Sequence, residues 1–121
     1  MSYRLKRLAD ARIDGERFST AYGNKVFSRK ELQALNQLLI TSERKLGNTE
    51  GLPRREWFKH QIYAPGFYTG YGVKTMPQIR EGLEEGRFTE AQGGVRTVSA
   101  AVNALASQVE QAAQALQQVV K

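Results

Sequence analysis

The C-terminal part of the chain carries the most regular pattern of apolar positions. From Thr89 to Lys121 apolar residues recur at alternating spacings of three and four, which predicts one long helix with a single apolar stripe. Thr89 and Gln92 have the spacing of a capping box at its start. We expect this stripe to supply the following core residues of a helical bundle: Val98, Val102, Leu105, Val109 and Leu116.

A second helix is predicted between residues 28 and 46. Ser28 and Glu31 have the spacing of another capping box, and Gly47 follows as a stop signal. Leucines at helical spacing give this segment one apolar face. We expect that face to pack in the same core through Leu32, Leu35 and Leu39.

Two further helices complete the predicted fold. Residues 3–22 carry a helical apolar face that is interrupted at Gly15. A short helix is expected to start near Thr75, to tolerate Pro77 in its first turn and to end at Gly86. The fold class is therefore all-α, an up-and-down bundle of about four helices.

The segment from residue 51 to 77 does not fit a helix, because three prolines bracket it and glycines and aromatic residues are dense within it. We expect a long ordered loop between the second and third helices, because its many aromatic residues favour packing. Loops of this length are commonly functional. Its basic residues Arg54, Arg55 and Lys59 are expected on the solvent side. The residues expected to anchor it on the bundle are Trp57, Phe58, Tyr63 and Pro65.

The composition limits what this chain can do alone. Its 121 residues fit one domain over residues 1–121. The absence of cysteine excludes disulfides, thiolate catalysis and cysteine-based metal sites, and the single histidine, His60, excludes multi-histidine sites. We therefore expect no enzymatic activity, metal or cofactor in this chain. No apolar run approaches the roughly 20 residues of a membrane span, so no membrane partner is expected.

The positive charge is concentrated near the N-terminus. Residues 1–30 hold eight basic and three acidic side chains, a balance of +5 out of a total of +6. Such an end attracts nucleic acid or an acidic partner, with an affinity that falls steeply as salt is added. Acidic residues are interleaved with the basic ones, and the segment lacks the pattern of aromatic residues on which bases stack, so we expect no nucleic-acid partner. A basic helical binding module remains the alternative function.

Residues 51–80 carry an unusual set of residue types in a fixed order. Gly51-Leu52-Pro53 is followed by Trp57-Phe58, by His60 with Ile62-Tyr63-Ala64-Pro65, by Tyr71, and by Met76-Pro77. This order resembles the signature of the transferrin receptor-like dimerisation domain. That domain is the C-terminal helical domain of glutamate carboxypeptidase II-type zinc peptidases and of transferrin receptors. The resemblance covers about residues 26–121 and is strongest over residues 51–80.

The resemblance implies a non-catalytic dimerisation and interaction domain. In this family the zinc ligands and the catalytic base lie in a separate catalytic domain, so zinc is expected only there. The resemblance further implies that the chain forms a homodimer. It also implies that the chain packs on the peptidase catalytic domain of a full-length protein and lends a loop to the substrate pocket.

One substrate-contacting position is also implied by the resemblance. Glutamate-preferring members of the family place a Lys-Tyr pair of this loop against the terminal carboxylate of the substrate. Tyr71 matches the tyrosine, whereas Gly70 stands at the lysine position, so the charged half of the clamp is missing. The alternative for Tyr71 is a packing aromatic residue. His60 is expected either to lie beside the pocket or to form a hydrogen bond with a loop carbonyl that holds the turn at Tyr63-Ala64-Pro65.

Overall fold

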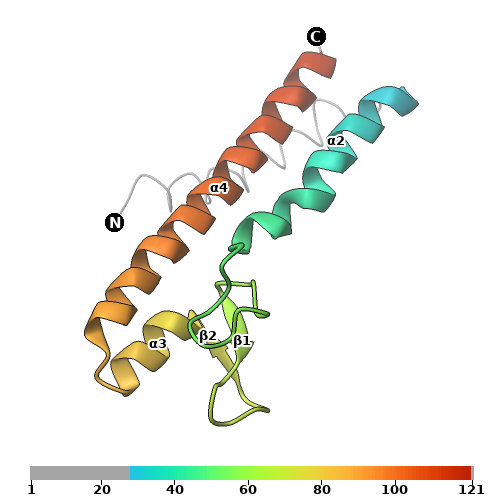
Figure 1. Ribbon diagram of the computed structural model, residues 1–121. Helices are drawn as coiled ribbons and strands as arrows, with labels where there is room; N and C mark the ends of the chain where they lie inside the picture. Colours follow the sequence, from blue (N-terminus) through green and yellow to red (C-terminus); the bar gives the residue numbers. More distant parts are fainter. Residues whose placement is uncertain (1–27, 121) are drawn as a thin grey trace.

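The computed structural model describes residues 28–120, and the helix predicted over residues 3–22 lies outside them. Two shorter helices, α2 and α3, run along one long helix, α4, and a small hairpin projects from the junction between the shorter two (Figure 1). The elements in chain order are α2 (Arg29–Thr41), the 3-10 helix η1 (Ser42–Leu46), β1 (Tyr63–Pro65), β2 (Val73–Thr75), α3 (Pro77–Glu84) and α4 (Phe88–Val120).

Helix α2 begins as the sequence predicts. The Ser28 Oγ accepts a hydrogen bond from the Glu31 amide, and the Glu31 carboxylate accepts one from the Ser28 amide, which completes the capping box. Near its end, the buried Gln108 of α4 donates from Nε2 to the Leu38 carbonyl at 2.6 Å and to the Thr41 hydroxyl at 2.8 Å. This polar contact between otherwise apolar surfaces fixes the register of α2 against α4.

Helices α3 and α4 form an antiparallel pair whose closest approach depends on glycine. Pro77 lies in the first turn of α3, as predicted, because its missing N–H is not needed there. A Cβ on Gly82 would lie 2.9 Å from the Ala91 Cβ of α4. Gly86, at a φ of +69°, turns the chain between the helices. The backbones can therefore approach more closely than larger residues would permit.

The prediction of a mostly helical fold is confirmed for residues 28–120, whereas a four-helix bundle is not shown, because the first predicted helix lies outside these residues. These residues form three α-helices and a two-stranded antiparallel hairpin in which Tyr63 pairs with Thr75, Ala64 with Lys74 and Pro65 with Val73. Strands of three residues are too short to show a period of two, so the pattern of the sequence did not reveal them. The segment predicted as a loop therefore contains the hairpin.

The predicted bundle core is only partly enclosed. Val98, Leu105, Leu35 and Leu116 are half-buried, whereas Leu32, Leu39, Val102 and Val109 are 40–50% exposed. The row of α4 that faces α2 and α3 consists of smaller or polar residues instead. Among residues 28–120 a single layer of helices covers only one side of α4, so the flanking valines and leucines are not enclosed by these residues. The buried members of the inner row are Ala91, Gly94, Ala101, Gln108 and Ala112.

Candidate interaction site

The loop between η1 and β1 is held by backbone hydrogen bonds and one buried leucine. The Gln61 amide donates to the Leu46 carbonyl at 2.9 Å, and the Leu52 amide donates to the Phe58 carbonyl at 3.0 Å. Leu52 itself is fully buried. Gly51 has a φ of +75°, and a Cβ there would lie 2.2 Å from the Glu56 carbonyl oxygen, so only glycine fits this turn.

Arg55 is the polar anchor of this loop, which corrects the expectation that it faces solvent. Its side chain lies in contact range of two rings, with Cζ 5.7 Å from the Phe58 centroid and 5.4 Å from the Phe67 centroid. The guanidinium donates from Nη2 to the Glu81 Oε2 at 2.6 Å and from Nη1 to the Pro65 carbonyl. Arg55 and Glu81 are 5% and 3% exposed, so this is a buried ion pair.

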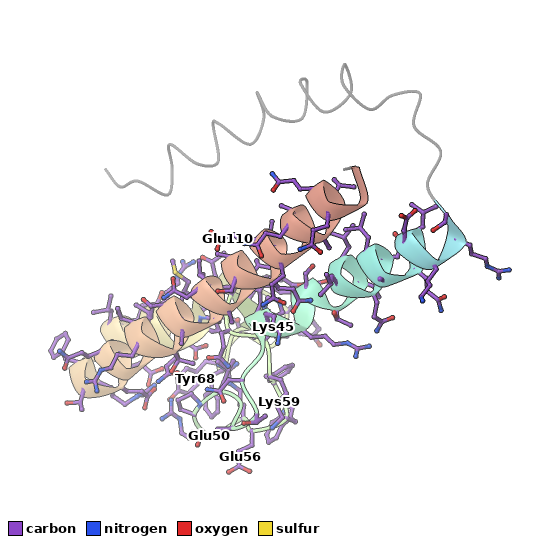
Figure 2. The ribbon with its side chains drawn as sticks, turned by 90° about the horizontal axis from the view of Figure 1, so that it is seen from above. Lys45, Glu50, Glu56, Lys59, Tyr68 and Glu110 are labelled. Atoms are coloured by element: carbon purple, nitrogen blue, oxygen red, sulfur yellow. The ribbon has the colours of Figure 1, made fainter. Side chains whose placement is uncertain are left out.

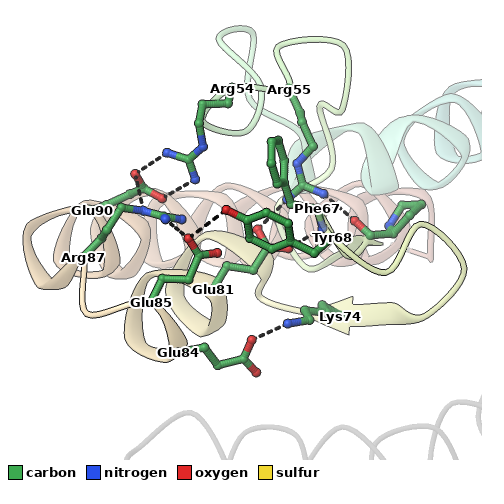
Figure 3. A network of polar contacts seen from close by, with 11 residues as sticks. Arg54, Arg55, Phe67, Tyr68, Lys74, Glu81, Glu84, Glu85, Arg87 and Glu90 are labelled. Atoms are coloured by element: carbon green, nitrogen blue, oxygen red, sulfur yellow. Dashed lines mark hydrogen bonds and ion pairs between the residues drawn. The ribbon is translucent and has the colours of Figure 1, made fainter.

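Glu81 connects the same ion pair to the tip of the hairpin. Its Oε1 accepts a hydrogen bond from the Phe67 amide at 2.8 Å, while its Oε2 takes the bond from Arg55. Pro65 ends β1, so the guanidinium and the carboxylate together hold the chain on either side of Gly66. One helix residue thus positions the start of the tip, as Figure 3 shows.

Arg54 makes a second bridge to the helices. Its guanidinium donates from Nη1 and Nη2 to the two Glu90 oxygens at 2.8 and 3.0 Å, a bidentate geometry (Figure 3). The hydrogen bond from Arg54 lowers the pKa of Glu90 below its ordinary value, and the nearby charge of Arg87 adds to this effect. Arg54 and Lys59 are exposed, as expected, and only Arg55 is buried. Arg54 nevertheless ties the loop to α4, as Arg55 ties it to α3.

Basic side chains around the hairpin are matched by carboxylates of α3 and the turn after it. Lys74 pairs with Glu84, and this contact lowers the pKa of Glu84. Arg87 pairs with Glu85, whose Oε2 also lies 3.5 Å from the Tyr68 hydroxyl. The end of the molecule that carries the hairpin is therefore rich in charges whose fields largely cancel.

His60 holds the start of β1 and does not contact the tip. Its Nδ1 accepts hydrogen bonds from the amides of Ile62 at 3.2 Å and Tyr63 at 3.3 Å. Its ring stacks on that of Tyr63 with centroids 4.0 Å apart. Tyr63 in turn donates from its hydroxyl to the Glu43 carboxylate at 3.1 Å, which raises the pKa of Tyr63. His60 therefore contacts the turn at Tyr63, but it does so as an acceptor from backbone amides instead of through the expected bond to a loop carbonyl.

The tip between the strands presents its aromatic side chains to solvent. The Gly66 amide donates to the Gly72 carbonyl at 2.8 Å and closes the tip, in which Gly70 has a φ of +64°. Tyr71 is 100% exposed, so no residue within 28–120 packs on its side chain. Gly70 has nothing within 4 Å of the position its Cβ would take. The structure leaves this tip open to a partner.

The residues expected as aromatic anchors divide into two groups. Phe58 and Pro65 are half-buried and contact Arg55, which agrees with an anchoring position. Trp57 is 71% exposed and Tyr63 is also exposed, so neither is enclosed by residues 28–120. Arginine carries much of the anchoring instead, and this was missed. The signal that could have found it is the presence of Arg55 among aromatics, with Glu81 on the inner side of the predicted short helix.

An apolar face runs along one side of the helical layer. Valines seven residues apart form a row on α4, and leucines seven residues apart form a row on α2. Each row lies beside the residues that contact the other helix, and both rows are turned about their helix axes in the same sense. In antiparallel helices such rows lie on the same side of the layer. The same relation holds for α3 against α4. The apolar face consists of Leu32, Leu39, Met76, Leu83, Phe88, Val95, Val102 and Val109, each 40–68% exposed.

Neither a metal site nor a membrane helix is found in the described part of the chain. Over residues 28–120 no three His, Asp or Glu side chains are grouped so that they could hold a metal ion. None of the helices there is long and apolar enough to cross a membrane. The feature that stands out is an open surface with an ordered aromatic tip at one end.

Residues 28–120 thus form a long helix that supports two shorter helices and an aromatic hairpin, and they leave one apolar face uncovered, as in a small helical interaction domain. The chain belongs to the transferrin receptor-like dimerisation domain family, whose model matches residues 5–119. This confirms the resemblance drawn from the sequence. The match extends further towards the N-terminus than the residues on which that resemblance was based.

Three relatives cover parts of the chain. A probable glutamate carboxypeptidase of Arabidopsis thaliana is 35% identical over 57 residues, 47% of this chain and 8% of that protein. A probable glutamate carboxypeptidase of Arthroderma benhamiae is 42% identical over 52 residues, 43% of this chain and 7% of that protein. An inactive zinc metalloprotease of Schizosaccharomyces pombe is 31% identical over 83 residues, 69% of this chain and 10% of that protein. Each match thus spans a tenth of the relative or less.

Proposed function

We propose that this chain is a non-catalytic dimerisation and interaction domain of a glutamate carboxypeptidase-like protein, and that it associates with a second copy of itself through the apolar face. The observation that carries the proposal is the size of that face. From Phe88 to Val109 it extends along α4 for about 32 Å at the helical rise per residue. Exposed apolar patches of such extent usually mark interfaces.

The family membership supports self-association as the use of this face. A two-fold dimer brings the same patch of both copies together, which is the commonest closed arrangement of identical chains. At the end of the face, between α2 and α4, lies a groove of about 380 Å³ lined by Leu32, Leu35, Ala115 and Leu116 among others. Such a groove gives a side chain of the second copy a place to insert.

The aromatic tip has a separate role in this proposal. In a full-length protein the tip would face a catalytic domain and contribute Tyr71 to its substrate pocket. Full exposure of Tyr71 and the ordered path of the chain from Arg55 through Phe67 support a pre-arranged contact surface. Gly70 supplies no charge at the neighbouring position. Zinc and the catalytic base belong to the absent domain, so peptidase activity is not expected from this chain alone even with zinc added.

The test is the mass of the chain in solution, measured by size-exclusion chromatography with light scattering over a tenfold range of concentration. We expect a species of twice the 13.6 kDa of one chain. Val102→Glu should return it to the monomer, because a charge in the interface is buried without a partner. Val73→Glu is the control, since Val73 is also an exposed valine, at 67% against 40% for Val102, but lies on the hairpin. A strict monomer at every concentration would contradict the dimer.

The alternative, a basic module that binds nucleic acid or an acidic partner, rests on residues 1–30. All but three of these residues lie outside the described part of the chain. In the described part, the basic residues nearest the hairpin are paired with glutamates, as Arg54 with Glu90 and Lys74 with Glu84. No observation on the structure therefore favours this second function over the first.

A further inference from the structure

Histidine is the side chain whose ordinary pKa places its change of charge between pH 5 and 8. His60 lies at the base of the hairpin, where its ring contacts the backbone. It is the single histidine of the chain. Its Nδ1 is an acceptor for two backbone amides, those of Ile62 and Tyr63, at 3.2 and 3.3 Å. An acceptor nitrogen carries no proton, so these bonds assign the neutral tautomer with its hydrogen on Nε2.

The two amides held by His60 belong to the segment that leads into the hairpin. Tyr63 is the first residue of β1, and the Met76 amide at the far end of β2 donates to the Ile62 carbonyl at 2.6 Å. His60 also forms a bridge with Gly47 at the end of η1. The backbone on either side of His60 thus pairs with the end of η1, while its imidazole holds the turn that leads into the hairpin.

Protonation changes both sides of the ring. A proton on Nδ1 turns the acceptor into a donor that faces the two amide donors of Ile62 and Tyr63, so both hydrogen bonds are lost. On the other side Nε2 lies buried, 3.9 Å from the Glu43 Oε1 and without a hydrogen-bond partner within the described residues. The imidazolium attracts this carboxylate, which is also the acceptor for the Tyr63 hydroxyl.

The charged and titratable groups around the ring are few. Glu43 approaches from η1, and Tyr63 stacks on the ring from β1. Lys59 precedes His60 in the chain, but its Nζ donates to the Thr49 carbonyl. Gly47, the bridge partner, brings no charge. Within residues 28–120 the ring is thus near one carboxylate, that of Glu43.

We propose that His60 is a proton-sensitive latch of the aromatic hairpin. The neutral imidazole holds the amides of Ile62 and Tyr63 and so fixes the turn that leads into β1. The imidazolium releases both amides and draws the Glu43 carboxylate from the Tyr63 hydroxyl. Mild acid therefore loosens the base of the hairpin and the tip that it carries, while α3 and α4 stay packed. This regulation is independent of whether the chain dimerises.

The test follows hydrogen exchange of backbone amides in the full chain by NMR, with rates expressed relative to those of an unfolded chain at the same pH. The His60 imidazole is titrated in the same samples. We expect the protection of the Ile62 and Tyr63 amides to fall by about tenfold between pH 8 and pH 5, the factor for one lost hydrogen bond. The fall should follow the His60 titration curve, while the amides of Ala101 and Ala112 in α4 keep their protection.

Two variants separate the latch from a merely structural role. His60→Asn keeps a neutral acceptor near the position of Nδ1 and cannot gain a proton in this range, so its Ile62 and Tyr63 amides should stay protected at both pH values. His60→Phe removes the acceptor and should leave them weakly protected at both. The proposal is overturned if these amides lose protection with pH in His60→Asn. It is equally overturned if His60 titrates without any change at them, or stays neutral down to pH 5.

Discussion

The buried ion pair between Arg55 and Glu81 gives a direct test of how the hairpin is held. We predict that Arg55→Met lowers the free energy of unfolding by about 3–5 kcal/mol, the usual cost of breaking a buried ion pair. Both side chains are almost fully buried, at 5% and 3% exposure. Methionine replaces the volume, but Glu81 becomes an unpaired buried charge and the Pro65 carbonyl loses its donor.

The assay is urea unfolding followed by far-ultraviolet circular dichroism. Protein concentration is held constant, because a dimer would make the apparent stability depend on it. Arg80→Met is the matched control, because Arg80 lies on α3 next to Glu81 and also pairs with a glutamate. The pair between Arg80 and Glu84 is exposed, with side-chain exposures of 54% and 44%. Its loss should cost about 0–1 kcal/mol.

A double substitution completes the argument. Arg55→Met combined with Glu81→Met removes both charges, so it should cost less than the sum of the two single changes. If Arg55→Met does not fold, Glu81→Gln replaces it, because glutamine keeps an acceptor for the Phe67 amide. The reasoning is refuted if Arg55→Met is no more harmful than the Arg80 control, or if the two single effects simply add.

Two further predictions concern packing and pH. Gly82→Ala should destabilise the chain by about 1–3 kcal/mol, because its Cβ would meet Ala91 at 2.9 Å. Gly93→Ala should instead stabilise it by up to about 1 kcal/mol in the same urea assay, because its backbone is helical and its Cβ would meet only the flexible end of the Gln78 side chain, at 3.4 Å. The pKa of Glu90 is lowered in the folded state, so its ionised form stabilises the fold. This contribution is fully present above the ordinary glutamate pKa of about 4.3 and is lost as the pH falls through the lower pKa of the folded state. The urea midpoint should therefore fall between about pH 5 and pH 3, and less so in Arg54→Met; equal falls would contradict this assignment.

The helical part of the fold could be predicted because its signals are local. The capping box at Ser28, the proline in the first turn of α3 and the long periodic segment after residue 88 each specify their own element. The family resemblance rested on the same kind of information, a fixed order of unusual residues. These features need no knowledge of what the chain packs against.

The hairpin and its anchors could not be predicted in the same way. Arg55 is buried because Glu81 lies 26 positions later on a helix that folds back beside it, and no local pattern records that approach. Trp57 is apolar by type yet exposed. The open rows of α4 were assigned to a core because periodicity gives the face of a helix but not what covers it. Sequence reasoning failed where the surroundings of a side chain decide its role.

The pairing of basic and acidic residues around the hairpin bears on how this end of the molecule meets a partner. Arg54, Arg55 and Lys74 each carry a positive charge that a glutamate within direct contact offsets. Charges that cancel at such short range leave little field beyond a Debye length, about 8 Å at physiological ionic strength. A partner is then not steered from a distance, so its rate of encounter should be ordinary and nearly independent of salt. Selectivity at this end must come from the shape of the aromatic tip once contact has been made.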